Sequence, residues 1–413
     1  MNGLANMLLR MCLTVSAVIF SVPVANAAVP LLPLCSWPVE STGQGFLNVA
    51  TQDTNTTYWF MPIDIRHWKS VRLHGTYPNA RFFNFATYGP TGLLINTLFD
   101  EDIAPDPGSV NPFKTSTATG TNTYTVTVGP SSLGSSNSLS VGASPLAFLV
   151  YRVIVPDRGL NRAGGVDVPS VTLVAQDGSE SRLRACPFAS AESSLGAMIP
   201  LLIASGFSQA TDLIQSILAA ADQRTSMTGS CTMSQPIRPA ALNFGPAPGT
   251  DFFPNPPTTY LQTPNVCFQP NEVIVVRGKG LVFPNTYLGG SESDPAFDGQ
   301  VQVRYWSMCN NDGVFPYPVV ACAADFQTTL DGDQRYTYVV LTDPTPTDTT
   351  WLPWGPTNLP ITLIFRSISF DPNYETIPSA YYPQGVICDQ TVFKAQGWRG
   401  CFAAAGIKAD TAR

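Results

Sequence analysis

The cysteines carry the clearest chemical signal in the chain. There are nine, and all but Cys12 lie beyond the first thirty residues. If Cys12 leaves with a signal peptide, eight cysteines remain. An even number in an exported chain indicates disulfides, and spacing alone leaves their connectivity open. Closeness in sequence favours Cys309 with Cys322 and Cys388 with Cys401. Cys35 with Cys186 would then join the two ends of the first half, and Cys231 with Cys267 would tie down the entry to the second. Free or metal-bound thiols are the alternative, but there is no Cys-x-x-Cys and only two histidines are available as co-ligands.

Two arginines occupy matching places in two apolar stretches. Arg152 follows the apolar run 146–150, and Arg366 follows the run 361–364. A guanidinium at such a position can bind an anionic ligand. The alternative is a structural arginine paired across a sandwich, for example with the aspartate five residues later, Asp157 or Asp371.

Two tryptophans form a second candidate ligand site. Trp351-Leu352-Pro353-Trp354 lies in a polar stretch rich in Pro and Thr, which we expect to be a loop. Indole rings on a loop can stack on a sugar or on another protein, so these residues suggest a glycan or protein partner. The alternative is a loop folded back over the edge of a sandwich, with both rings half-buried.

A group of aspartates is the candidate metal site. Asp100, Asp102 and Asp106 precede Gly108 in a segment that contains several prolines. They offer the hard oxygen ligands that Ca²⁺ takes, although their spacing differs from that of an EF-hand loop. A solvated turn is the alternative.

No catalytic signature is evident. The chain lacks a Gly-x-Ser-x-Gly elbow, and neither His67 nor His74 lies beside a serine motif. A pair of carboxylates for glycoside hydrolysis cannot be chosen from sequence, although Glu101 is flanked by other acids. A carboxylate-dependent hydrolase acting on polysaccharide stays open as an alternative function.

The first residues predict export. Arg10 is the only charge in residues 1–27, and it is followed by an apolar run, 11–24, and by Ala25-Asn26-Ala27. This is the layout of a signal peptide, which we expect to be cleaved after Ala27. The apolar run is too short to span a bilayer, so no transmembrane anchor is expected after cleavage. The expected location is the periplasm or the cell exterior.

Composition excludes some partners. Hydrophobic residues make up 44% of the chain, enough for a core, while charged residues make up only 12%. The net charge of −7 becomes −8 when Arg10 leaves with the signal peptide. An acidic chain without basic runs is not expected to bind nucleic acid by neutralising phosphates.

Short motifs recur in the same order in the two halves of the chain. The arginine, isoleucine and aspartate of 151–157 recur at the same spacing in 365–371, an offset of 214 positions. Three further pairs resemble each other: 71–75 with 275–278, 80–85 with 303–308, and 124–128 with 336–340. Each motif is short and rich in β-branched and aromatic residues, so we expect a duplicated unit of antiparallel strands.

The region between the repeats has a different character. Leu213, Ile214, Ile217 and Leu218 lie on one face of a predicted helix. Residues 231–259 contain seven prolines and predict a semi-rigid spacer. The expected organisation is a signal peptide at 1–27, sandwiches at 35–187 and 260–405, a helical connector at 188–230 and a Pro-rich linker at 231–259.

Several segments resemble a known group of proteins. These are NARFFNFATY (79–88), DPGSVNPF (106–113), RYWSMC (304–309) and WLP (351–353). They are similar to segments of uncharacterised exported bacterial proteins with tandem jelly-roll-like β-sandwich domains, a domain of unknown function. The resemblance implies the fold and no activity.

We therefore expect a mainly β protein of two tandem antiparallel, jelly-roll-like sandwiches. The function that we favour is an exported binding or structural protein. A subunit of a surface assembly, including a homo-oligomer, is a further alternative, since low charge and exposed strand edges favour packing against neighbours.

Overall fold

The computed structural model describes most of the chain beyond the predicted signal peptide. It describes residues 32–408 except 34, 45–46, 116–119, 131–135, 187–198, 201, 204–205, 225–230, 232–238, 248–252, 290–300, 345–347 and 372. The predicted signal peptide and its cleavage point lie outside the described residues. Among the described helices, none is long and apolar enough to cross a membrane.

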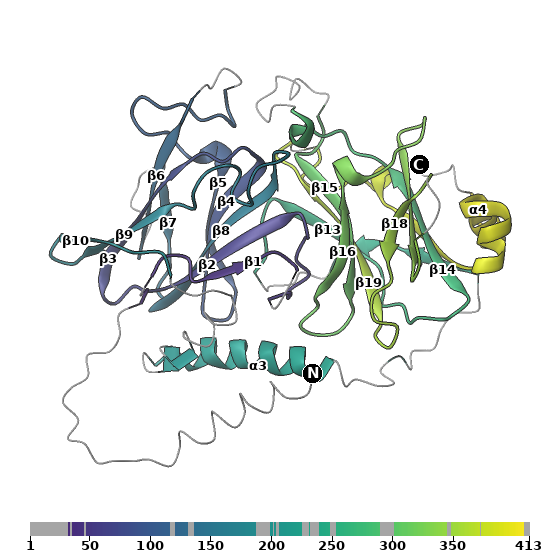
Figure 1. Cartoon of the computed structure of the whole chain (residues 1–413), viewed down its shortest axis with the longest axis horizontal. Coiled ribbons are helices and arrows are strands. Elements are labelled where there is room, and N and C mark those ends of the chain that lie inside the picture. Colours follow the sequence, from purple (N-terminus) through teal and green to yellow (C-terminus); the bar gives the residue numbers. More distant parts are fainter. Residues whose placement is uncertain are drawn as a thin grey trace, which may run out of the picture. The chain divides into compact units, whose positions relative to one another are not determined.

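The first half of the chain forms two five-stranded sheets (Figure 1, purple to blue). One has the order β1-β2-β8-β4-β5, built from β1 (Val39–Ser41), β2 (Thr56–Asp64), β4 (Ala80–Tyr88), β5 (Leu94–Phe99) and β8 (Leu146–Pro156). The other has the order β10-β9-β3-β6-β7, built from β3 (Trp68–Thr76), β6 (Thr123–Gly129), β7 (Ser138–Ser140), β9 (Ser170–Ala175) and β10 (Glu180–Arg182).

The second half repeats this arrangement (Figure 1, teal to yellow). One sheet has the order β12-β13-β19-β15-β16, built from β12 (Gly245–Pro246), β13 (Thr258–Gln262), β15 (Tyr305–Asp312), β16 (Val319–Ala324) and β19 (Ile361–Ile368). The other has the order β11-β20-β14-β17-β18, built from β11 (Ala240–Asn243), β14 (Glu272–Lys279), β17 (Arg335–Leu341), β18 (Thr350–Pro353) and β20 (Gln384–Asp389). The mainly β, two-sandwich prediction is confirmed.

One detail of strand pairing differs from the purely antiparallel expectation. In the first half β7 pairs with β6 in parallel, and in the second half β18 pairs with β17 in parallel. Both β7 and β18 are short edge strands, where a change of direction disturbs a single ladder. The same exception at the same place adds to the likeness between the halves.

A glycine and a tyrosine meet in the same way in each core. Gly75 in β3 lies opposite Tyr124 in β6, and Gly278 in β14 lies opposite Tyr336 in β17. A Cβ added at Gly75 would lie 2.6 Å from the Tyr124 hydroxyl oxygen, and one at Gly278 would clash with that of Tyr336 in the same way. Both glycines are therefore required because the ring packs directly against the backbone.

Strands β8 and β19 are buried on both faces, which explains their apolar sequences. In β8, Leu149, Tyr151 and Val153 enter the core of the first sandwich. Because side chains alternate along a strand, Arg152 and Ile154 lie on the opposite face. That face is covered by the second half of the chain and by residues of the predicted connector, so a polar group on it is also removed from water.

The two halves contact each other through one sheet of each. We call β1-β2-β8-β4-β5 and β12-β13-β19-β15-β16 the facing sheets, because side chains on their outer faces pack together. Phe82 and Ile154 from the first form one buried cluster with Tyr305 and Ile368 from the second. This contact is continuous with two buried ion pairs.

Each ion pair joins the two halves. The Arg81 guanidinium lies 2.8 Å from the Asp325 carboxylate, and the Arg304 guanidinium lies 2.7 Å from the Asp100 carboxylate. Asp100 begins the 3-10 helix η2 (Asp100–Asp102), and Asp325 begins η5 (Asp325–Gln327). Burial raises the pKa of each carboxyl to about 6, against the opposing effect of the neighbouring arginine.

The described residues contain four disulfides, and these include the two pairs that closeness in sequence favours. They are Cys35–Cys186, Cys231–Cys267, Cys309–Cys322 and Cys388–Cys401. Disulfides persist in oxidising compartments, so they indicate an extracytoplasmic protein.

The helices are few. Helix α3 (Ser208–Arg224) lies in the predicted connector, and α4 (Gln390–Ala404) follows β20 and is tied to it by Cys388–Cys401. Short 3-10 helices also occur at η3 (Thr286–Leu288) and η6 (Ser379–Tyr381). The predicted Pro-rich spacer differs from expectation, because β11 and β12 within it pair with β20 and β13.

Candidate ligand-binding site

Arg152 is a buried cation with neutral partners. Its Nη1 donates to the side-chain oxygens of Asn84, at 3.0 Å, and Asn255, at 2.7 Å. Its Nη2 donates to the Tyr88 hydroxyl at 3.2 Å. A guanidinium has five N–H donors, so these three bonds leave two unused. Among the described residues, no carboxylate forms an ion pair with Arg152.

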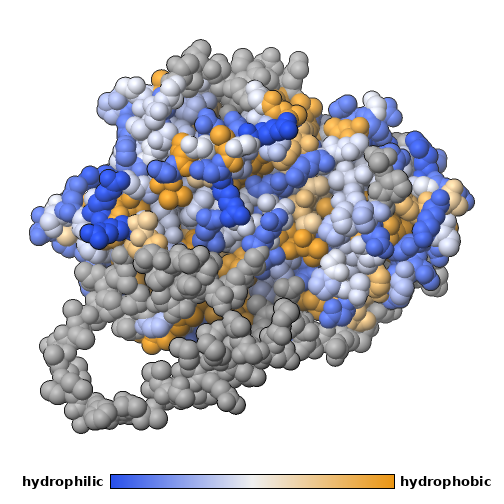
Figure 2. All heavy atoms as spheres, in the orientation of Figure 1, coloured by the Kyte–Doolittle hydropathy of each residue, from blue (hydrophilic) through white to orange (hydrophobic). Residues whose placement is uncertain are grey.

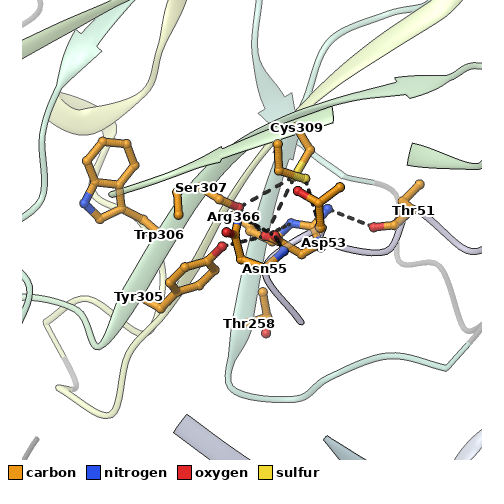
Figure 3. Close-up of polar contacts among 12 residues, drawn as sticks. Thr51, Asp53, Asn55, Thr258, Tyr305, Trp306, Ser307, Cys309 and Arg366 are labelled. Carbon is orange, nitrogen blue, oxygen red and sulfur yellow. Dashed lines mark hydrogen bonds and ion pairs between the residues drawn. A yellow bond between two sulfur atoms is a disulfide. The ribbon is translucent and has the colours of Figure 1, made fainter. Parts of the chain in front are cut away.

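Arg366 holds the matching position in the second half but does have a counter-ion. Its Nε lies 3.8 Å from the Asp53 carboxylate, and its Nη2 donates to the Thr51 carbonyl at 2.8 Å. Figure 3 shows Asp53 between Arg366 and two hydroxyl donors from β15. These are Tyr305, at 2.8 Å, and Ser307, at 2.6 Å.

The partners of the two arginines are exchanged between the halves. Arg152 in the first half bonds to Asn255, which lies three residues before β13, and Arg366 in the second half pairs with Asp53, which lies three residues before β2. Asp53 and Asn255 also form the same turn: their carbonyls accept from the N–H of Thr56 at 3.1 Å and of Thr258 at 2.9 Å. The two arginines therefore meet equivalent turns of the opposite half, and the residue at the equivalent place is a carboxylate in one turn and an amide in the other.

A tyrosine accompanies each arginine. Tyr58 lies opposite Arg152 on neighbouring strands, and Tyr260 lies opposite Arg366. The Arg152 guanidinium lies over the Tyr58 ring at 5.0 Å, and the Arg366 guanidinium lies over the Tyr260 ring at 5.6 Å. Such contacts favour a charged arginine in a site with little water.

These four residues line a cavity between the facing sheets, with a volume of about 160 Å³. The rest of its wall is largely apolar. Phe60, Phe148 and Val150 come from the outer face of the first facing sheet, and Ile214 and Ile217 come from α3. The lining of the cavity therefore combines two cationic groups and hydrogen-bonding groups with apolar side chains.

Tyr58 is protonated in the cavity. Burial raises the pKa of Tyr58, although Arg152 and Arg366 both favour the phenolate. A protonated phenol can donate a hydrogen bond. The Tyr58 hydroxyl has no hydrogen-bond partner within the described part of the chain, so this donor remains for a ligand.

The expectation that Arg152 or Arg366 pairs with the aspartate five residues later is wrong. Neither Asp157 nor Asp371 is a partner of its arginine. The actual partners come from distant segments of the chain, because each arginine lies on the outer face of its sheet and meets the other half of the chain there.

The tryptophan prediction is corrected in part. The Trp-Leu-Pro segment is not a loop but the edge strand β18, which pairs with β17. Strand alternation places Trp354 in the core of the second sandwich, where it packs against Phe268 and is 2% exposed. Trp354 therefore has no free face for a sugar, whereas Trp351 is half-buried and donates to the Leu341 carbonyl.

The structure does not bring together the aspartates predicted to bind Ca²⁺. Asp100 is fully buried and forms an ion pair with Arg304, while Asp102 is exposed. Asp106 lies 3.4 Å from His74. One described group has metal-ligand atoms close together, Asp53 with Cys309 and Cys322, but both of these sulfurs form a disulfide.

Sequence reasoning missed most of the residues around the two arginines. A signal for them exists: Thr-Thr-Tyr occurs at 56–58 and again at 258–260, each preceded by Asp53 or Asn255 at the same distance. This fifth recurrence would have placed both tyrosines at equivalent positions. It would not have shown that they meet the arginines in one cavity.

Comparison with known proteins defines the fold and leaves the activity open. No protein-family model and no curated protein matches the chain. An uncharacterised protein from Burkholderia cenocepacia has a similar structure, with a TM-score of 0.52 and 13% identity over 87% of this chain and 84% of that chain. A protein from Vibrio parahaemolyticus reaches a TM-score of 0.40 at 12% identity over 81% of this chain and 90% of that one.

Proposed function

We propose that the protein is an exported binding protein that holds a small ligand in the cavity between its two repeats. The observation that carries the proposal is a cavity lined by apolar side chains and by two buried arginines. Apolar pockets with a few convergent polar groups are the usual form of small-molecule sites. The four disulfides and the signal-like first residues support export.

Two further features favour binding in this cavity. Burial raises the pKa of Asp100 and Asp325 to about 6, but both carboxyls are held in ion pairs and neither lines the cavity. They therefore do not support a hydrolase there. On the face shown in Figure 2, the described apolar residues form small groups separated by polar ones. A broad apolar docking surface for another protein is therefore not supported on that face.

The test is a calorimetric titration with four small probes: benzoate, hexanoate, benzyl alcohol and hexanol. We expect at least one to bind the wild-type protein with one molecule per chain. The Ile214→Trp variant, which fills the cavity, should lose this binding. Leu218→Trp on the same helix is the matched control, because Leu218 does not line the cavity. Unchanged binding in Ile214→Trp, or no binding of any probe to wild type, would refute the proposal.

A further inference from the structure

The charge of the cavity wall narrows the class of ligand. Arg152 and Arg366 are the charged residues among those that line the cavity. Asp53 balances Arg366, while Asn255 stands at the equivalent position beside Arg152 and carries no charge. The described residues therefore leave one positive charge in the site without a counter-ion.

A buried cation without a counter-ion is costly. The side chain of Arg152 is 3% exposed, so water replaces little of the lost solvation. Its neutral partners and the Tyr58 ring offset only part of this cost. An anion beside Arg152 would supply the missing charge, as Asp53 does at the equivalent site.

On these grounds, and resting on the proposed function, we infer that the ligand is a small monocarboxylate with an apolar body, bound by Arg152. One unbalanced charge suits a monoanion, because a dianion would bring a second buried charge without a partner. A carboxylate also matches the hydrogen-bonding fork of a guanidinium. The Tyr58 hydroxyl offers a further donor on the same side of the cavity.

The apolar lining of the cavity and the cavity volume define the body of the ligand. Phe60, Phe148, Ile214 and Ile217 give the cavity an apolar lining beside the two arginines. The volume of about 160 Å³ is close to that of an apolar cavity known to hold one benzene molecule, on the order of 150 Å³. A single ring or a short alkyl chain therefore fits.

The chain itself suggests the decisive variant. Asn255→Asp changes the amide to a carboxylate of the same shape and gives Arg152 the counter-ion that Arg366 already has. We expect it to keep or raise the melting temperature and to abolish the preference for anions. Asn255→Ala is the matched control, because it removes the amide without adding charge and should keep that preference.

The measurement compares each carboxylate with its neutral counterpart by calorimetry, benzoate with benzyl alcohol and hexanoate with hexanol. We expect wild type to bind the carboxylate at least tenfold more tightly, and Asn255→Asp to bind it no more tightly than the alcohol. If the alcohols bind wild type as well as the carboxylates do, the ligand class is wrong but the binding function stands. If no probe binds, both fail. An anion preference that survives in Asn255→Asp would overturn the assignment to Arg152.

Discussion

Arg81 and Asp325, 244 residues apart in the chain, form an ion pair of 2.8 Å in which both side chains are fully buried. The pair has a counterpart in Arg304 and Asp100, with the roles of the two halves reversed. Arg81 and Arg304 lie at equivalent places in the repeat, as do Asp100 and Asp325. The contact thus has the reciprocal form of a twofold dimer interface, within one chain.

Removal of one arginine from either pair should destabilise the protein strongly. Arg81→Met leaves the Asp325 carboxylate buried without its counter-ion, and Arg304→Met does the same to Asp100. We expect each to lower the free energy of unfolding by about 3–5 kcal/mol, measured by urea denaturation. Arg162→Met at the exposed pair with Glu40 is the control and should cost at most about 1 kcal/mol. Equal costs at the three sites would contradict this account.

Stability should increase as the pH falls from 7 to 5. The pKa of Asp100 and of Asp325 is about 6 in the folded protein, whereas an unfolded aspartate has an ordinary value of 3.8. Between these values the folded state binds more protons than the unfolded state, so lowering the pH favours folding. Carboxyls with a lowered pKa, such as Asp331, change the stability of the protein only at lower pH. Urea denaturation across this range measures the effect.

A double variant isolates these two carboxyls. Asp100→Asn with Asp325→Asn keeps both groups neutral at every pH, so its stability should vary less between pH 5 and 7. A wild-type protein that becomes steadily more stable from pH 5 to 7 would show that the pairs remain charged throughout.

The disulfides should differ in how much they contribute to the free energy of unfolding. Cys35–Cys186 closes a loop of 151 residues, while Cys388–Cys401 closes one of 13. The loop-entropy relation gives about 5 kcal/mol for the first and about 3 kcal/mol for the second. Replacing each pair by serines and comparing thermal unfolding tests the order. A larger loss for the short loop would mean that local packing of α4 outweighs chain entropy.

The two tryptophans of β18 should respond oppositely to truncation. Trp354→Ala leaves a void in the second core and should cost about 3–5 kcal/mol of unfolding free energy. Trp351→Ala at the half-buried position should cost clearly less. Chemical denaturation of both variants checks this, and similar losses would contradict the burial difference.

Local features of the sequence predicted much of the fold. Closeness in sequence favoured Cys309–Cys322 and Cys388–Cys401, and both disulfides are present. The four recurring motifs fall on equivalent strands: β3 with β14, β4 with β15, β6 with β17, and β8 with β19. Helix α4 was missed, because its apolar residues do not form a regular stripe and Gly397 interrupts it at a positive φ of 64°.

The site was less predictable, because its residues meet only through long-range packing. The spacing of Arg152 and Arg366 showed that they are equivalent, but not that each takes its partner from the other half. Asn84 and Asn255 lie 68 and 103 residues from Arg152. From the sequence, Asp100 was expected to be a surface ligand of Ca²⁺. Its neighbours in sequence do not show that it is buried in an ion pair with Arg304, 204 residues later.

The reciprocal ion pairs constrain how the two copies can change. Each half carries one arginine and one aspartate for the contact, and each of these pairs with its opposite in the other half. A substitution in one copy therefore needs compensation more than two hundred positions away. A gene fragment encoding one copy alone would still bring both members of the pair, and its product would present a surface complementary to itself.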